Sequence, residues 1–76
     1  MDPKLIKQYI EAGLQCDHVD VTGDGRHFEA VIVSPLFRGK PKVHQHQLVY
    51  AALGDRMRED IHALSMRTLT PEEWQG

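Results

Sequence analysis

The sequence predicts an α+β fold, with helices packed on one face of a three-stranded mixed sheet. Three observations support this. Apolar residues recur at helical spacing in two segments. Two short segments of alternating apolar and polar residues flank a glycine turn, which is typical of a β-hairpin. A third strand-like segment follows a helical crossover, which favours a parallel strand beside the hairpin. The expected order of elements is α-β-β-α-α-β-α.

The first predicted helix begins at Asp2 and Pro3. Aspartate can cap free amide groups, and proline fits the first helical position because its missing N–H would have no partner there. Gly13 weakens the last turn, so the helix is expected to end near residue 14. Its apolar residues recur every three or four positions and form one stripe: Leu5, Ile6, Tyr9, Ile10 and Leu14.

The predicted hairpin consists of a strand over residues 18–22, a turn, and a return strand over residues 27–34. Val19 and Val21 alternate with polar neighbours, as in a half-buried strand. Gly23 and Gly25 bracket the turn, and we expect both to supply the positive φ angles that it requires. Pro35 ends the return strand because it has no N–H for a ladder.

A second long helix is predicted over residues 43–53, where Val43, Val49, Tyr50 and Leu53 fall on one side. Gly54 breaks this helix. Three shorter elements are expected after the break: a helix over 56–60 capped by Asp55, a strand over 61–69 that buries Leu64 and Met66, and a final turn of helix that begins with Thr70 as cap, Pro71 and Glu73.

Length and composition limit the functions to consider. A chain of 76 residues is expected to form one domain, 1–76, with little room for an enclosed active site. A net charge of −2 gives no general attraction to nucleic acid. The single cysteine, Cys16, cannot form an intramolecular disulfide and is expected to be a packing residue rather than a reactive thiolate. With no signal peptide or apolar span in the sequence, we expect a cytoplasmic protein with no membrane contact.

A small basic cluster surrounds the start of the second long helix. It consists of Arg38, Lys40, Lys42 and His44, with His46 one turn further along. Such side chains, together with free helix-start amides, can contact phosphate groups. The alternative is a solubilising surface patch. His46 falls within the apolar stripe, so it is either a partly buried structural histidine or a contact residue.

His27 and His62 form a second candidate group, because each opens a predicted strand. If those two strands are parallel neighbours, both imidazoles lie at the same end of the sheet. Imidazole binds zinc, copper and iron well. Two ligands do not complete a tetrahedral site, so a partner or an added thiolate would have to supply the others. The alternative is a pair of ordinary polar residues at strand ends.

Four motifs in fixed order resemble the BolA family over nearly the whole chain. They are Phe37-x-Gly39-Lys40, the run from Gln45 to Tyr50, the run from Ile61 to Leu64, and Thr68-x-Thr70-Pro71-x-x-Trp74. The segment from Gly23 to Phe28 is most similar to the short bacterial branch associated with acid stress. The resemblance implies a class II KH-like fold and a protein that is not an enzyme. Consistent with this, no nucleophile–base pair stands out in the sequence.

The resemblance implies two roles. In the first, the chain is an adaptor that is a monomer alone and a heterodimer with a monothiol glutaredoxin, sharing a [2Fe-2S] cluster for iron–sulfur and iron homeostasis. The partner and glutathione supply thiolates, and this chain supplies His62 and a Cys or His of the hairpin loop. The loop over residues 22–26 holds neither residue, so His27 is the nearest candidate.

The second implied role is a DNA-binding transcriptional regulator of stress response and cell morphology, which uses residues 38–50. The Gly-x-x-Gly loop of nucleic-acid-binding KH domains is absent, because Gly54 stands alone between the two middle helices. Phosphate clamping of the KH type is therefore not supported.

Overall fold

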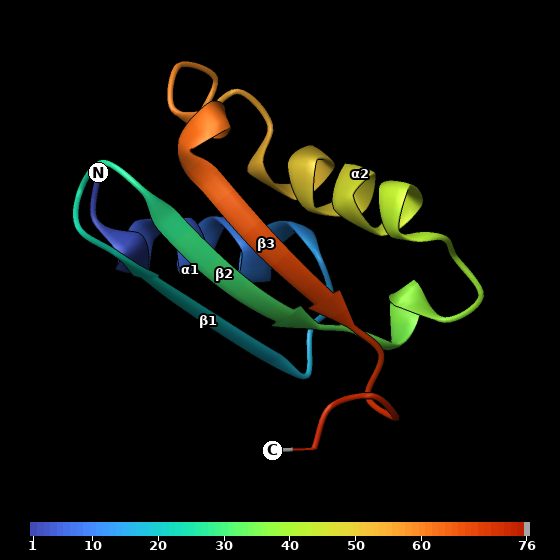
Figure 1. The fold of residues 1–76 in the computed structure, drawn as a ribbon. Coiled ribbons are helices and arrows are strands. Elements are labelled where there is room, and N and C mark those ends of the chain that lie inside the picture. Colours follow the sequence, from blue (N-terminus) through green and yellow to red (C-terminus); the bar gives the residue numbers. More distant parts are fainter. Residues whose placement is uncertain (76) are drawn as a thin grey trace.

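The computed structural model describes residues 1–75 and confirms the α+β class. Two α-helices, α1 (Pro3–Gly13) and α2 (Lys42–Leu53), accompany three strands, β1 (His18–Gly23), β2 (Phe28–Val33) and β3 (Leu64–Leu69). Short 3-10 helices, η1 (Pro35–Phe37) and η2 (Ile61–Ala63), precede α2 and β3. The helices lie against one face of the sheet (Figure 1). The class II KH-like label remains a prediction.

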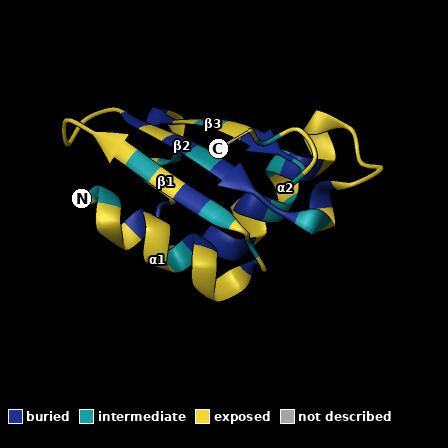
Figure 2. Cartoon of the chain, turned by 90° about the horizontal axis from the view of Figure 1, so that it is seen from below, coloured by how far each residue is buried: buried dark blue, intermediate teal, exposed yellow. Residues whose placement is uncertain are grey.

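The sheet has the predicted topology. Its strand order is β1-β2-β3, with β1 and β2 antiparallel and β2 and β3 parallel. Phe28 at the start of β2 is paired with Leu64 at the start of β3. Buried and exposed residues alternate along much of the sheet (Figure 2), because one face meets the helices and the other meets solvent.

The core lies between the sheet and the two helices. Its fully buried side chains come from every layer, among them Ile6, Ile10, Phe28, Ile32, Phe37, Val49 and Leu53. Asp2 caps α1 as predicted, since its carboxylate accepts a hydrogen bond from the Lys4 amide at 2.9 Å. The packing of α1 against α2 is close at Gly13, where an added Cβ would lie 2.8 Å from the Ala52 Cα.

The two turn glycines have different roles. Gly25 has a φ of 94°, as predicted, whereas Gly23 has no positive φ. Gly23 pairs with Phe28, and an added Cβ there would lie 2.5 Å from the Phe28 ring. The prediction that both glycines supply positive φ angles is therefore wrong for Gly23. That position needs glycine because an aromatic ring passes directly over its backbone.

The predicted short helix over residues 56–60 is a series of turns. Isolated bonds join Arg56 N–H to the Leu53 carbonyl and Arg58 N–H to the Asp55 carbonyl, and they do not form a continuous ladder. Asp55 does not cap this segment; its carboxylate instead pairs with Arg58 at 3.2 Å. The chain after residue 60 forms η2 before β3 begins at Leu64, so the strand starts three residues later than predicted.

The C-terminal segment forms its predicted start but no helix. Glu73 N–H donates to the Thr70 hydroxyl at 3.2 Å, and Thr70 N–H donates to the Glu73 carboxylate at 2.8 Å. These are the two reciprocal bonds of a capping box. Residues 71–73 nevertheless form a turn, because a single helical turn gains too few hydrogen bonds to offset the entropy of nucleation.

The buried face of α2 differs from the predicted one. Val49 and Leu53 are buried as expected, but Val43 is 61% exposed and Tyr50 is 43% exposed. The residues of α2 that face the core are Gln45, Val49, Ala52 and Leu53. The prediction sorted α2 by apolarity alone, and it was wrong because a glutamine takes a core position in place of Val43.

Candidate functional site

His27 and His62 lie at the same end of the sheet, as the parallel arrangement predicted. His27 directly precedes Phe28, and His62 lies two residues before Leu64, the residue paired with Phe28. Paired residues of neighbouring strands are about 5 Å apart. Both histidines are exposed. Neither stands within a strand, however, because β2 begins at Phe28 and His62 belongs to η2.

His27 is held by the hairpin turn. The Asp24 carboxylate accepts hydrogen bonds from the amides of Arg26 and His27, at 2.8 and 2.9 Å. Asp24 N–H in turn donates to the His27 carbonyl at 3.2 Å. These amide bonds, from His27 and Arg26, lower the pKa of the Asp24 carboxyl because they stabilise its charged form. The backbone of His27 is thus fixed while its imidazole remains exposed.

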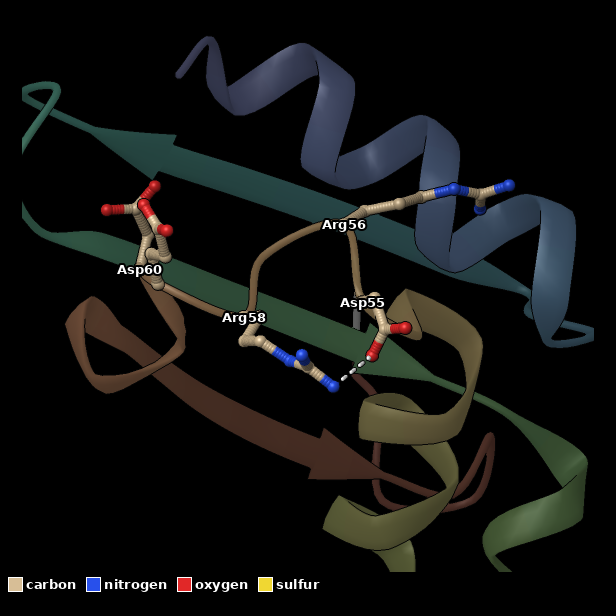
Figure 3. Close-up of a pocket in the computed structure, with 5 residues that line it drawn as sticks. Asp55, Arg56, Arg58 and Asp60 are labelled. Atoms are coloured by element: carbon tan, nitrogen blue, oxygen red, sulfur yellow. Dashed lines mark hydrogen bonds and ion pairs between the residues drawn. The ribbon is translucent and has the colours of Figure 1, made fainter.

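His62 is held by the chain on both sides of it. Met57 before it is 1% exposed and Ala63 after it is 9% exposed, so both are buried in the core. The guanidinium carbon of Arg56 lies 4.7 Å from the centroid of the Tyr9 ring, a cation–π contact that joins this loop to α1. Figure 3 shows the Arg56 side chain directed toward α1.

The loop before His62 forms an open, charged depression of about 320 Å³. Its lining consists of Asp55, Arg56, Arg58, Glu59 and Asp60 (Figure 3). It has no apolar lining of the kind that encloses small molecules. Within residues 1–75, no group of three or more histidine, cysteine or acidic side chains is arranged to hold a metal ion.

The basic cluster at the start of α2 is largely occupied by contacts within the chain. The Arg38 guanidinium forms a two-point ion pair with the Glu72 carboxylate, at 2.8 and 2.5 Å. Lys40 Nζ donates to the Leu36 carbonyl at 2.8 Å, and Lys42 Nζ donates to the Thr68 carbonyl. Arg38 therefore also connects the loop before α2 to the segment after β3, and Lys42 connects α2 to β3.

The two histidines of α2 are placed differently. His44 is exposed, in agreement with its predicted place on the solvated side, and His46 is half-buried. The exposed apolar residues Val43 and Tyr50 lie on the same helix. The N-terminal end of α2 has no side-chain cap, so it presents free amides beside this basic cluster.

Sequence reasoning missed the role of Gln45, which is 4% exposed. Its side-chain amide donates to the carbonyls of Phe37 and Lys40, at 3.1 and 2.8 Å. Its oxygen accepts from the Thr68 hydroxyl at 2.6 Å. A signal was available, because Gln45 stands four residues before Val49 and eight before Leu53, in register with the buried stripe.

Cys16 agrees with the packing role predicted for it. The thiol is half-buried, and its Sγ lies 3.3 Å from the Leu14 carbonyl oxygen. Burial, followed by the charges of Glu11 and Asp17, raises the pKa of the Cys16 thiol to about 11. The reactive thiolate is therefore scarce at neutral pH.

The helices within residues 1–75 include none that is both long and apolar enough to cross a membrane.

Comparison with known proteins places this architecture in a family. The family model described as "BolA-like protein" matches residues 4–73. The acid stress protein IbaG of Escherichia coli (strain K12) is 36% identical over 75 residues, covering 97% of this chain and 89% of that protein. The DNA-binding transcriptional regulator BolA of Haemophilus influenzae is 41% identical over 59 residues, covering 78% of this chain and 57% of that protein.

A solved structure agrees over the whole fold. The structure of a bolA protein homologue from Coxiella burnetii superposes with a TM-score of 0.87 and 48% identity, covering 100% of this chain and 99% of that chain. The match to the family model, the identities and this superposition span the helices and the sheet that were described above. The chain belongs to the BolA-like family.

Proposed function

We propose that this chain is a non-enzymatic adaptor that partners a monothiol glutaredoxin and shares a [2Fe-2S] cluster with it, in iron–sulfur and iron homeostasis. The observation that supports the proposal is the parallel pairing of β2 and β3, which brings His27 and His62 to one end of the sheet. The partner and its thiolates are those that the family resemblance implied.

The donor set of this chain fits half of such a site. A [2Fe-2S] cluster takes four protein or thiol ligands, and imidazole can replace thiolate at one of its irons. His27 and His62 are both exposed, so both rings are accessible to a partner. Cys16 is a poor donor because its thiol is half-buried and its pKa is about 11. We therefore assign the two imidazoles to this chain and the remaining ligands to glutaredoxin and glutathione.

The test is anaerobic reconstitution of the chain with a monothiol glutaredoxin, glutathione, iron and sulfide, followed by absorbance and circular dichroism in the visible range. The proposal expects the mixture to give a spectrum distinct from that of the glutaredoxin alone. His62→Ala should abolish this difference and His27→Ala should weaken it. His44→Ala is the matched control, because His44 is also exposed but lies on α2.

An unchanged spectrum on mixing, or a spectrum that survives His62→Ala, would rule out this assignment. Loss of the spectrum with His62→Ala but not with His27→Ala would keep the adaptor role and remove His27 from the ligand set. Because both histidines are exposed, neither substitution is expected to unfold the chain.

A second candidate function is DNA binding by a transcriptional regulator. It is favoured by the name of the 41% identical relative from Haemophilus influenzae, a DNA-binding transcriptional regulator. In this chain the proposed contacts are Arg38, Lys40, Lys42, His44 and His46. Lys40→Ala and Lys42→Ala should weaken binding to duplex DNA and flatten its dependence on salt. Undetectable binding at low salt would exclude this function.

A further inference from the structure

The ion pair between Arg38 and Glu72 joins two segments that lie far apart in the sequence. Arg38 Nε and Nη2 each donate to a different oxygen of the Glu72 carboxylate, at 2.8 and 2.5 Å. This paired geometry is also the one in which a guanidinium recognises a phosphate group. The Glu72 carboxylate therefore occupies the position on Arg38 that an external phosphate oxygen pair would take.

The other two cations of the cluster remain available to an anion. Lys40 and Lys42 each bond to a backbone carbonyl, but an ammonium group has three donors and keeps the others free. Arg38 differs because its guanidinium is engaged through two nitrogens, Nε and Nη2, at once. Of the three cations, Arg38 is thus the one with a two-point donor edge, that of Nε and Nη2, taken up within the chain.

The segment that carries Glu72 is anchored on both sides of that residue. The capping box between Thr70 and Glu73 closes the turn that contains Glu72. After it, the Trp74 ring stacks on the His18 ring of β1, with centroids 4.7 Å apart and planes 19° apart. The hydrogen bond from Arg38 lowers the pKa of the Glu72 carboxyl, which shows that the pair favours the charged form of this carboxylate.

We propose that the C-terminal segment, residues 70–75, masks an anion site on Arg38, with Glu72 acting as an internal substitute for the phosphate group of a nucleic acid. The proposal deepens the second candidate function and rests on it for the identity of the ligand. The Arg38–Glu72 pair is exposed, with 55% and 61% of the two side chains accessible, so an external phosphate can compete for the guanidinium.

The first experiment measures the masking itself. Inorganic phosphate is titrated into the ¹⁵N-labelled chain, and the shift of the Arg38 Nε–H signal is followed by NMR. Glu72→Gln should tighten phosphate binding at Arg38 about two- to fivefold, the range expected for release of one exposed ion pair. Adding Arg38→Ala to Glu72→Gln should remove this gain in affinity. Because the double variant has no Arg38 Nε–H signal, its phosphate binding is followed by the remaining amide signals around the basic cluster.

The control separates masking from net charge. Glu29→Gln removes the same charge from an exposed residue near the start of β2, the end of that strand remote from Arg38. This substitution should change the affinity for phosphate only slightly, because the effect of a distant charge is screened by salt. An equal gain from Glu29→Gln and Glu72→Gln would overturn the proposal, as would no gain from Glu72→Gln.

The second experiment repeats the comparison with duplex DNA at low salt, by fluorescence anisotropy. Tighter DNA binding by Glu72→Gln than by Glu29→Gln supports both the masking and the DNA-binding function. If phosphate binding tightens but none of the variants binds DNA, the masking stands and the DNA-binding function fails. If the wild type binds DNA and Glu72→Gln changes neither measurement, the function stands and the masking fails.

Discussion

Gln45→Met tests whether the buried network around Gln45 stabilises the fold. The substitution keeps the length of the side chain but removes its amide. It leaves the Thr68 hydroxyl, which is 1% exposed, without its acceptor. A buried polar group without a partner costs about 1–3 kcal/mol. The substitution also removes a bond to each of two carbonyls. The Phe37 carbonyl keeps a bond from the Lys40 amide, and the Lys40 carbonyl belongs to an exposed residue, so these two carbonyls add less to the loss of stability.

Burial of the apolar methionine side chain at the same position offsets the smaller cost at these two carbonyls. The expected net loss is about 1–3 kcal/mol in the free energy of unfolding, measured by urea denaturation. For a domain of this size the loss corresponds to a fall of roughly 5–20 °C in Tm. Gln47→Met is the matched control on the exposed side of α2 and should change stability by less than about 0.5 kcal/mol.

A rescue experiment decides whether the hydroxyl is the cause. Thr68→Val removes the hydroxyl with little change in shape. Added to Gln45→Met, it should restore part of the lost stability, because the double variant has no buried hydroxyl without an acceptor. Equal stability of the Gln45→Met and Gln47→Met variants, or a double variant less stable than Gln45→Met alone, would refute the reasoning.

Two further predictions concern packing and the thiol. Gly13→Ala should lower stability by about 1–2 kcal/mol in thermal denaturation, because the clash with the Ala52 backbone outweighs the helix propensity gained; an unchanged or raised Tm would contradict this. Alkylation of Cys16 by iodoacetamide at pH 8 should be about a hundredfold slower than for a thiol at its ordinary pKa of 9.0, because the native pKa is about 11. The rate of alkylation should rise as the pH approaches 11, and unfolding the chain in denaturant should raise the rate to that of an ordinary thiol. Equal rates in the native and denatured chain would show that the thiol is not shielded.

The topology of the sheet was predictable because it depends on local patterns and one general rule. Alternation around Val19 and Val21 marked the first strand, and glycines marked the turn. The helical crossover then favoured a third strand parallel to its neighbour. The same reasoning predicted that His27 and His62 lie at one end of the sheet if the second and third strands are parallel neighbours.

Apart from the spacing of Gln45 with the buried stripe, the missed features depend on contacts that the sequence does not display. Periodicity places residues on a helix face, but the choice between Val43 and Gln45 for the core was decided by carbonyl partners on the preceding loop. The pairing of Arg38 with Glu72 joins residues 34 positions apart, and no local pattern indicates it. Likewise, the strong capping signal at Thr70 correctly predicted its hydrogen bonds but not the length of the element that followed.

The parallel register of β2 and β3 links ligand binding to stability. The hairpin turn and the loop after α2 are separated by the whole α2 crossover, yet Phe28 and Leu64 are paired. A ligand held by both His27 and His62 would cross-link these two segments, and only the folded chain brings them together. Such binding lowers the free energy of the native state alone, by an amount that grows with free ligand concentration. Occupancy and resistance to unfolding would then rise together, and hydrogen exchange in the crossover would report how much of the site is filled.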